Sequence, residues 1–134
     1  MHRDAYRFDP AELKARFNPE GSPLRRQQIR MKEMLKAFDA ICQKHNIPYW
    51  IASGTLLGCM RHGGFIPWDD DLDVEMLRPD YLRLLRILPK ELPEWMELQH
   101  RPTDPHYFYS YAKLRDKNSL LEETNGYDRI FRMR

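Results

Sequence analysis

Apolar residues recur every three or four positions in the segment that follows Ser22-Pro23, and this spacing predicts a long amphipathic helix. Serine and proline supply the start signal, and Asn46 and Pro48 should end the helix, because a residue that precedes proline disfavours helical backbone. A stripe of this kind is more typical of a core face than of a cofactor-binding face. Its members are Met31, Met34, Leu35, Phe38, Ile41 and Cys42.

A shorter helix is predicted ahead of it. Asp9-Pro10 is an N-cap and first-turn signal, residues 11–17 are amphipathic, and the Asn-Pro-Glu-Gly stretch at 18–21 ends the pattern. We therefore expect residues 1–22 to form a leader segment that lies on the domain, and residues 23–134 to form the domain itself.

Strands are predicted on both sides of a glycine-containing turn. Residues 49–52 form a short apolar run rich in strand formers, Ser53-Gly54-Thr55 interrupts it, and a short helix should follow over residues 56–61. Residues 71–76 then alternate strictly between acidic and apolar side chains, which predicts a half-buried strand.

One more helix and two more strands complete the pattern. The helix should begin at Pro79 and end at Pro89 and Pro93, because proline interrupts helical hydrogen bonding. Residues 95–100 and 107–114 have the composition of strands. The apolar face of the helix comprises Tyr81, Leu84, Leu85 and Leu88.

Composition is that of a single soluble globular domain. Of the 134 residues, 42% are hydrophobic and 31% are charged, unlike disordered or membrane-spanning chains. A net charge of +2 gives no indication of nucleic acid as a partner. Since no secretory signal or membrane-spanning run is apparent, we expect a cytoplasmic protein without an integral membrane segment. Cys42 and Cys59 should then be reduced thiols.

The densest charge in the chain is acidic. Asp69, Asp70, Asp71 and Asp73 place four carboxylates in five positions with no basic residue among them, so protons or cations must neutralise them. On a strand, three of these side chains (Asp69, Asp71 and Asp73) would project to one side. Oxygen-only ligands suit a hard cation, and magnesium in particular completes its shell with water and phosphate.

Other acidic motifs explain this segment less well. A solvated acidic edge strand does not require strict alternation or adjoining glycine turns. A calcium-binding EF-hand loop needs glycine where Val74 stands and prefers glutamate where Asp80 stands. A haloacid-dehalogenase-like nucleophile motif expects an apolar strand over residues 67–70. A metal-dependent glycosyltransferase also uses a DxD pair, and only the motif at Ser53-Gly54 separates the two cases.

Ser53-Gly54-Thr55 is a candidate phosphate cradle, because glycine lets the backbone approach a phosphate and a helix N-terminus offers unpaired N–H donors. The five histidines show no zinc-site spacing. Four basic residues near predicted element ends could neutralise phosphate oxygens, and the alternative for each, above all for His62 and Lys113, is an ordinary surface charge. They are Arg61, His62, Lys113 and Arg115.

The stretch from Ser53-Gly54-Thr55 through Gly63-Gly64 and Pro67-Trp68 to the four aspartates and Val74 resembles the signature of the LicD family, to which fukutin-related proteins also belong. The resemblance extends upstream over residues 31–51 and downstream to residues 111–119. It therefore covers most of the chain.

This resemblance implies a nucleotidyltransferase-like α/β (α+β) fold, a mixed sheet with flanking helices. It implies a metal-dependent transferase that passes a phosphocholine-like group from a CDP-activated alcohol, such as CDP-choline, to a hydroxyl of a glycan or glycolipid acceptor. Such enzymes act in the synthesis of lipopolysaccharide, teichoic acid or other cell-surface polysaccharide. The expected location is the cytoplasm, including the inner face of the membrane.

Carried over to this chain, the resemblance assigns Asp71 and Asp73 to Mg²⁺ or Mn²⁺, and Asp69 to a role as ligand or base. Phosphate would be held by Ser53, Gly54 and Thr55, with further contacts from Lys113 and Arg115.

The chain departs from the family pattern in one respect. Relatives are longer and carry a third acidic residue on a later strand, and residues 126–134 do not supply it. We therefore expect the fold and the site to be incomplete at the C-terminal side. The alternative hypothesis is a catalytically incomplete, nucleotide- or metal-binding remnant of the family.

Overall fold

The structure, a computed structural model, describes residues 8–121. These residues form helices and short strands, which confirms the predicted α+β class. The strands form two separate antiparallel pairs, β1 with β2 and β3 with β4, in place of one mixed sheet. In chain order the elements are α1 (Pro10–Phe17), α2 (Pro23–Lys44), β1 (Trp50–Ile51), α3 (Ser53–His62), β2 (Val74–Glu75), α4 (Arg78–Glu91), β3 (Met96–Gln99) and β4 (Lys113–Asp116).

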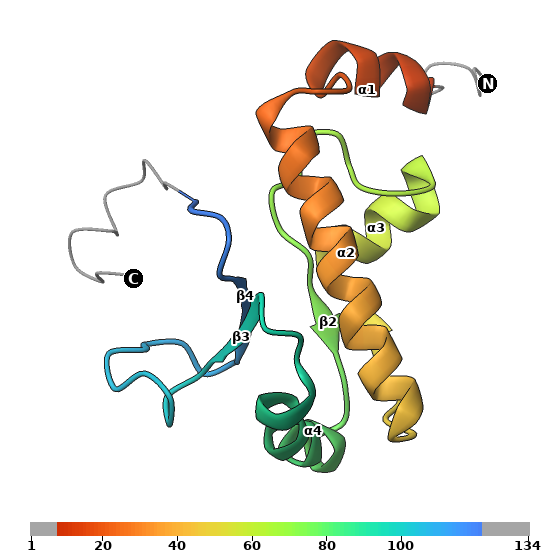
Figure 1. Ribbon diagram of the computed structural model, residues 1–134. Helices are drawn as coiled ribbons and strands as arrows, with labels where there is room; N and C mark the ends of the chain where they lie inside the picture. The colour runs from red at the N-terminus through yellow and green to blue at the C-terminus, as the bar shows by residue number, and fades with distance from the viewer. Residues whose placement is uncertain (1–7, 122–134) are drawn as a thin grey trace.

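The long helix α2 is the axis of the molecule, with α1 lying across its N-terminal end (Figure 1). As predicted, Ser22 caps α2, its hydroxyl accepting a hydrogen bond from the Arg25 amide at 3.2 Å. The apolar stripe of α2 packs against α4, β3 and Ile47, which lies three residues beyond the end of α2. The buried cluster comprises Phe38, Ile41, Cys42, Ile47, Leu84, Leu88 and Leu98.

Helix α4 presents the predicted face to this core, with Leu84 and Leu88 buried. The helix runs two residues past Pro89, where the sequence predicts its end. Proline removes only one N–H donor, and this one falls in the last turn, where the Leu92 amide still donates to the Leu88 carbonyl at 2.9 Å. No helix in the described part of the chain is long and apolar enough to cross a membrane.

The predicted strand over residues 71–76 is wrong in its first half, since only Val74 and Glu75 pair with β1. Ahead of Val74, the Asp73 carbonyl accepts from the Ala52 amide, but the Asp73 amide donates to the Thr55 hydroxyl and the Asp70 carbonyl accepts from Gln27. Burial nevertheless alternates along residues 71–76 as the pattern predicts.

The predicted strand over residues 107–114 is also displaced, because the pairing with β3 begins only at Lys113. Upstream of it the Tyr107 amide bonds back to the Asp104 carbonyl in a turn, and the Ala112 amide donates to the Tyr81 hydroxyl. Residues 107–112 therefore do not take part in the backbone pairing with β3. Tyrosine rings at 107, 109 and 111 instead contact one another in sequence, with centroids 5.6 and 5.1 Å apart.

Helix α1 and the residues just before it pack onto the end of α3 and the segment that follows α3 through aromatic rings. Phe17 meets Trp68 edge-on, with ring centroids 5.6 Å apart, and the ring centroids of Phe8 and His62 are 5.1 Å apart.

The two cysteines are free as predicted: Cys42 is buried, which raises the pKa of its thiol to about 11, and Cys59 is exposed.

Candidate functional site

The acidic residues lie on a loop that crosses the N-terminal part of α2 on its way from α3 to β2 (Figure 1). We call residues 66–73 the acidic loop. Asp69, Asp70 and Asp71 can each direct one carboxylate oxygen so that all three oxygens lie within 4.8 Å of one another. This spacing suits three ligands of one small cation.

Asp69 is the most enclosed of the three. Its Oδ2 atom is buried and has no hydrogen-bond partner within residues 8–121. Burial, followed by the negative charge of Asp71, raises the pKa of the Asp69 carboxyl. An enclosed carboxylate oxygen without a donor, beside two further carboxylates, is an arrangement that a bound cation would stabilise.

Asp73 belongs to the same loop, but it lies outside this group of three. Both backbone polar groups of Asp73 are hydrogen-bonded. The Asp73 carbonyl accepts from the Ala52 amide at 3.0 Å, and the Asp73 amide donates to the Thr55 hydroxyl at 3.0 Å. Burial, and then Asp71 and Glu75, raise the pKa of its carboxyl. The predicted metal ligand pair, Asp71 and Asp73, remains a prediction.

Ser53-Gly54-Thr55 forms the first turn of α3, whereas the sequence predicts a turn that precedes the helix. Ala52, at the N-cap, offers no side-chain cap, and Ser53 has a positive φ of 50°. Gly54 faces the acidic loop: a Cβ atom there would lie 2.9 Å from Asp69 Oδ2. The absence of a side chain at Gly54 therefore lets the Asp69 carboxylate approach the N-terminus of α3, where helix N–H groups favour negative charge.

A buried amide on α2 anchors the acidic loop. Gln28, 1% exposed, donates through Nε2 to the carbonyls of Ile66 at 3.1 Å, Pro67 at 3.3 Å and Asp69 at 2.9 Å. Gln27 donates to the Asp70 carbonyl at 2.7 Å. Neither glutamine is predicted from the sequence, because glutamine on a helix has no motif that distinguishes a buried anchor from a surface side chain.

Arg61 and His62 end α3. Arg61 is exposed, and its Nε donates to His62 Nε2 at 3.1 Å. Burial, and then the charge of Arg61, lower the pKa of His62, so the ring is neutral at pH 7 and packs beside Phe8 and Trp68. These contacts favour a packing role for His62.

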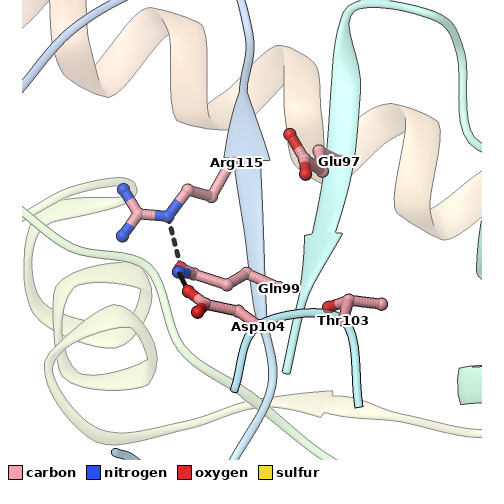
Figure 2. Close-up of a pocket in the computed structure, with 5 residues that line it drawn as sticks. All are labelled: Glu97, Gln99, Thr103, Asp104 and Arg115. Carbon is pink, nitrogen blue, oxygen red and sulfur yellow. Dashed lines mark hydrogen bonds between the residues drawn. The ribbon is translucent and has the colours of Figure 1, made fainter. Parts of the chain in front are cut away.

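Lys113 and Arg115 lie on β4. The Lys113 ammonium lies 4.3 Å from the centroid of the Tyr109 ring. Arg115 lines a cavity of about 130 Å³ beside β3, where its Nε donates to Gln99 and Gln99 in turn donates to Asp104 at 2.7 Å (Figure 2). Its buried Nη2 has no hydrogen-bond partner in the described part of the chain.

Tyr111, in the segment before β4, lies within electrostatic range of the acidic loop. Burial, then Tyr109, and then the carboxylates of Asp73 and Asp71 raise the pKa of the Tyr111 hydroxyl. Asp116, at the end of β4, is engaged elsewhere: Arg30 on α2 donates to its two carboxylate oxygens, at 2.8 Å each. This pairing holds the pKa of Asp116 well below its usual range.

Comparison with known proteins identifies the chain. Residues 46–125 match the family model described as LicD/FKTN/FKRP, nucleotidyltransferase domain. This chain belongs to the LicD/FKTN/FKRP family. The match includes α3, the acidic loop and β4, and leaves α1 and α2 outside it.

Named relatives of this LicD-family chain include transferases. The lipopolysaccharide cholinephosphotransferase LicD of Haemophilus influenzae is 42% identical over 104 residues, which are 77% of this chain and 39% of that protein. The human ribitol 5-phosphate transferase FKRP is 34% identical over 50 residues, which are 37% of this chain and 10% of that protein. The yeast Mannosyltransferase regulator 4 is 35% identical over 49 residues, 37% of this chain and 4% of that protein.

The LicD-family chain thus spans well under half the length of these relatives. No solved structure matches it significantly.

The residues of the acidic loop fit a hard divalent cation. Their donor atoms are all carboxylate oxygens, three of which can converge within 4.8 Å, and oxygen is the ligand that Mg²⁺ and Mn²⁺ take. The buried, unpartnered oxygen of Asp69 is a further sign of fit.

Proposed function

We propose that this chain carries the metal- and nucleotide-binding part of a LicD-type transferase. The reaction is transfer of a phospho-alcohol, phosphocholine or a similar group, from a CDP-activated donor to a glycan hydroxyl. The acceptor would be a lipopolysaccharide, teichoic acid or other cell-surface polysaccharide or glycolipid, modified in the cytoplasm or at the inner face of the membrane. The Haemophilus relative, named a lipopolysaccharide cholinephosphotransferase, supports this substrate class.

One observation carries the proposal: three carboxylates converge on a loop that contacts the N-terminal turn of α3, within the segment that matches the family. A cation site beside a helix N-terminus is suited to a diphosphate, because the cation and the unpaired helix N–H groups both attract phosphate oxygens. The bound Mg²⁺ or Mn²⁺ would neutralise charge on those oxygens.

The residues of the chain would then have separate tasks. Asp71, present in both the predicted pair and the observed cluster, would be the central metal ligand. Backbone amides of Ser53, Gly54 and Thr55 would hold phosphate, and Arg61 and Lys113 are candidates for further charge neutralisation. Positioning and charge neutralisation are the main contributions that a protein makes to phosphoryl transfer.

In the proposed reaction the acceptor oxygen forms a bond to the phosphorus that bears the alcohol. The bond from that phosphorus to the bridging oxygen of the diphosphate breaks, and cytidine monophosphate leaves with the electron pair. The acceptor hydroxyl proton passes to a carboxylate. Asp69 is the candidate for this task, because its enclosed Oδ2 atom has no hydrogen-bond partner within residues 8–121.

A second candidate function is binding without turnover. Asp116 is the nearest described aspartate on a later strand, and its two oxygens already pair with Arg30, so it does not provide a third free carboxylate. The yeast relative is named a regulator. Both candidates require the metal site, and only turnover separates them.

The metal site can be tested by titrating the protein with Mn²⁺ and counting free ion by electron paramagnetic resonance. Loss of a carboxylate that binds the ion directly should weaken binding by roughly a hundredfold in Asp71→Asn and Asp69→Asn, since loss of a residue that only orients a ligand already costs about ten- to a hundredfold. Asp73→Asn should weaken binding less. Glu94→Gln, which removes an exposed carboxylate outside the loop, is the matched control.

Turnover can be tested with a set of CDP-activated alcohols, a glycan acceptor and Mg²⁺, by measuring released cytidine monophosphate. Release that requires Mg²⁺ and is lost in Asp71→Asn supports the transferase. Mn²⁺ affinity with no release for any donor favours the binding remnant. Parent-like Mn²⁺ binding in Asp69→Asn and Asp71→Asn would show that the metal site lies elsewhere.

A further inference from the structure

Beyond this function, and resting on its metal site, we propose that Gln28 is a positioning residue: its buried side-chain amide sets the direction in which the acidic loop presents its carboxylates. Gln28 lies on α2, outside the residues that match the family model. It touches no substrate, and it acts through the backbone of Asp69 and its neighbours.

The geometry of the Gln28 amide is fixed from both ends. Its Nε2 faces three carbonyls of the acidic loop, those of Ile66, Pro67 and Asp69. Its Oε1 accepts from Asn18 Nδ2 at 3.0 Å and from Arg25 Nη1 at 3.2 Å. Since an NH₂ group only donates and a carbonyl oxygen only accepts, the reversed orientation would place like groups together on both sides.

Burial makes these bonds costly to lose. Gln28 is 1% exposed and Asn18 is fully buried, so water does not readily replace a missing partner. Without Nε2, the buried Pro67 carbonyl would lose a donor, and that of Asp69 would lose its 2.9 Å bond. The loop backbone would then move to find other donors, and Asp69 would move with it.

The loop has few other anchors near the cluster. Gln27 bonds the Asp70 carbonyl, and the Asp69 amide donates to the Ile66 carbonyl at 3.0 Å in a turn. Two adjacent glutamines of α2 therefore hold consecutive aspartates by their backbone, which leaves both carboxylates free to converge. Partners that orient ligands in this way affect metal affinity about ten- to a hundredfold.

The test compares Gln28→Met with Gln43→Met, which makes the same change on the exposed face of the same helix. Methionine keeps the length of glutamine and removes the donor. Mn²⁺ titration of the folded protein should show affinity weakened roughly tenfold in Gln28→Met and unchanged in Gln43→Met. Gln28→His, whose Nε2–H reaches a similar point, should restore part of the affinity, which a general packing defect would not allow.

Hydrogen exchange of the Asp69 and Asp73 amides supplies a metal-independent measurement, and Gln28→Met should accelerate it. If the parent binds Mn²⁺, parent-like affinity in Gln28→Met overturns the proposal and leaves the proposed function standing. If the parent binds no Mn²⁺, the proposed metal site fails, and exchange alone decides whether Gln28 orders the loop. Should Gln28→Met not fold, Gln27→Met, a change at a half-buried side chain, takes its place with the same expected direction.

Discussion

At the scale of single residues, the two glycines of α3 have different neighbours. A Cβ atom at Gly54 would meet a carboxylate oxygen of Asp69 at 2.9 Å, the far end of a side chain that can rotate away. A Cβ atom at Gly58 would meet the Gly64 carbonyl at 2.5 Å and the Ile66 amide at 2.8 Å, which are backbone atoms. A side chain at Gly54 would therefore disturb the candidate metal site, whereas a side chain at Gly58 would disturb the packing of the backbone.

Alanine substitution should separate these roles. Gly54→Ala should fold normally and bind Mn²⁺ roughly tenfold more weakly, because Asp69 must rotate out of the cluster. Gly58→Ala should lose about 1–3 kcal/mol of unfolding free energy through overpacking. Urea denaturation and Mn²⁺ titration measure the two effects.

Gly64→Ala is the control, since nothing lies within 4 Å of a Cβ atom there. Equal losses of stability in Gly54→Ala and Gly58→Ala would contradict the assignment of separate roles.

The candidate site could be predicted from the sequence where charge alone marks the residues. Asp69, Asp70 and Asp71 repel one another in any conformation, so their cluster is visible before folding. The contribution of Gln28 is not, because its importance depends on which carbonyls the fold brings to it from 38 to 41 residues further along the chain.

At the scale of elements, a paired Arg30 and Asp116 join α2 to β4 across 86 residues of sequence. The Arg30 guanidinium also lies 4.1 Å from the centroid of the Trp95 ring, next to β3. Ser119 and Asn118 add hydrogen bonds to the same carboxylate. The Asp116 side chain is 7% exposed, so this ion pair is better shielded from solvent than the others at the surface.

The ion pair between Arg30 and Asp116 should make the stability of the fold depend on pH. Because the folded-state pKa of Asp116 lies below the unfolded value of about 3.9, the pair stabilises the fold above that pH, and its contribution declines as pH falls below it. Asp116→Asn should be less stable at pH 7 and lose less stability between pH 5 and 3. Thermal unfolding across this range measures both.

Glu33→Gln, which removes an exposed ion pair with Lys36, should change the curve little. If Asp116→Asn loses as much stability between pH 5 and 3 as the parent does, the Arg30–Asp116 ion pair is not the source of the acid dependence.

Helices could be predicted more accurately than strands, and the reason is physical. The start of α1 and α2 depends on local caps at Asp9 and Ser22. The acidic segment has the alternation of a strand, but ahead of Val74 its backbone bonds to side chains, the Asp70 carbonyl to Gln27 and the Asp73 amide to Thr55. Long-range partners of that kind are not encoded in the local pattern.

At the scale of the whole molecule, α1 is bound to the acidic loop although it lies outside the family match. Phe17 contacts Trp68, and Asn18 donates to Gln28. The expected division into a leader at 1–22 and a domain at 23–134 is a boundary in sequence, and side-chain contacts cross it.

Weakening α1 should therefore loosen the loop. Asn18→Ala should lower the unfolding free energy by about 1–3 kcal/mol, the cost of leaving a buried polar group without a partner. Hydrogen exchange at the Asp69 amide should accelerate, because the Gln28 amide loses one of the two donors that orient it.

Glu12→Ala, an exposed change on α1, should alter neither measurement. Slow, parent-like exchange in Asn18→Ala would show that the hydrogen bond from Asn18 to Gln28 is not needed to order the loop.

Helix α2 connects the acidic loop to the hydrophobic core, so a tilt of the helix would move the loop. Gln28 on this helix holds the acidic loop, and Phe38 and Cys42 lie in the core. At a rise of 1.5 Å per residue, these two core residues lie about 15–21 Å along the helix from Gln28. A tilt of roughly 5° about the core end would move the loop end by about 1.5 Å, and a misplacement of that order can cost a hundredfold in rate. Conservative changes deep in the core, far from any carboxylate, should therefore displace the acidic loop, and Mn²⁺ titration would measure this displacement as a change in affinity.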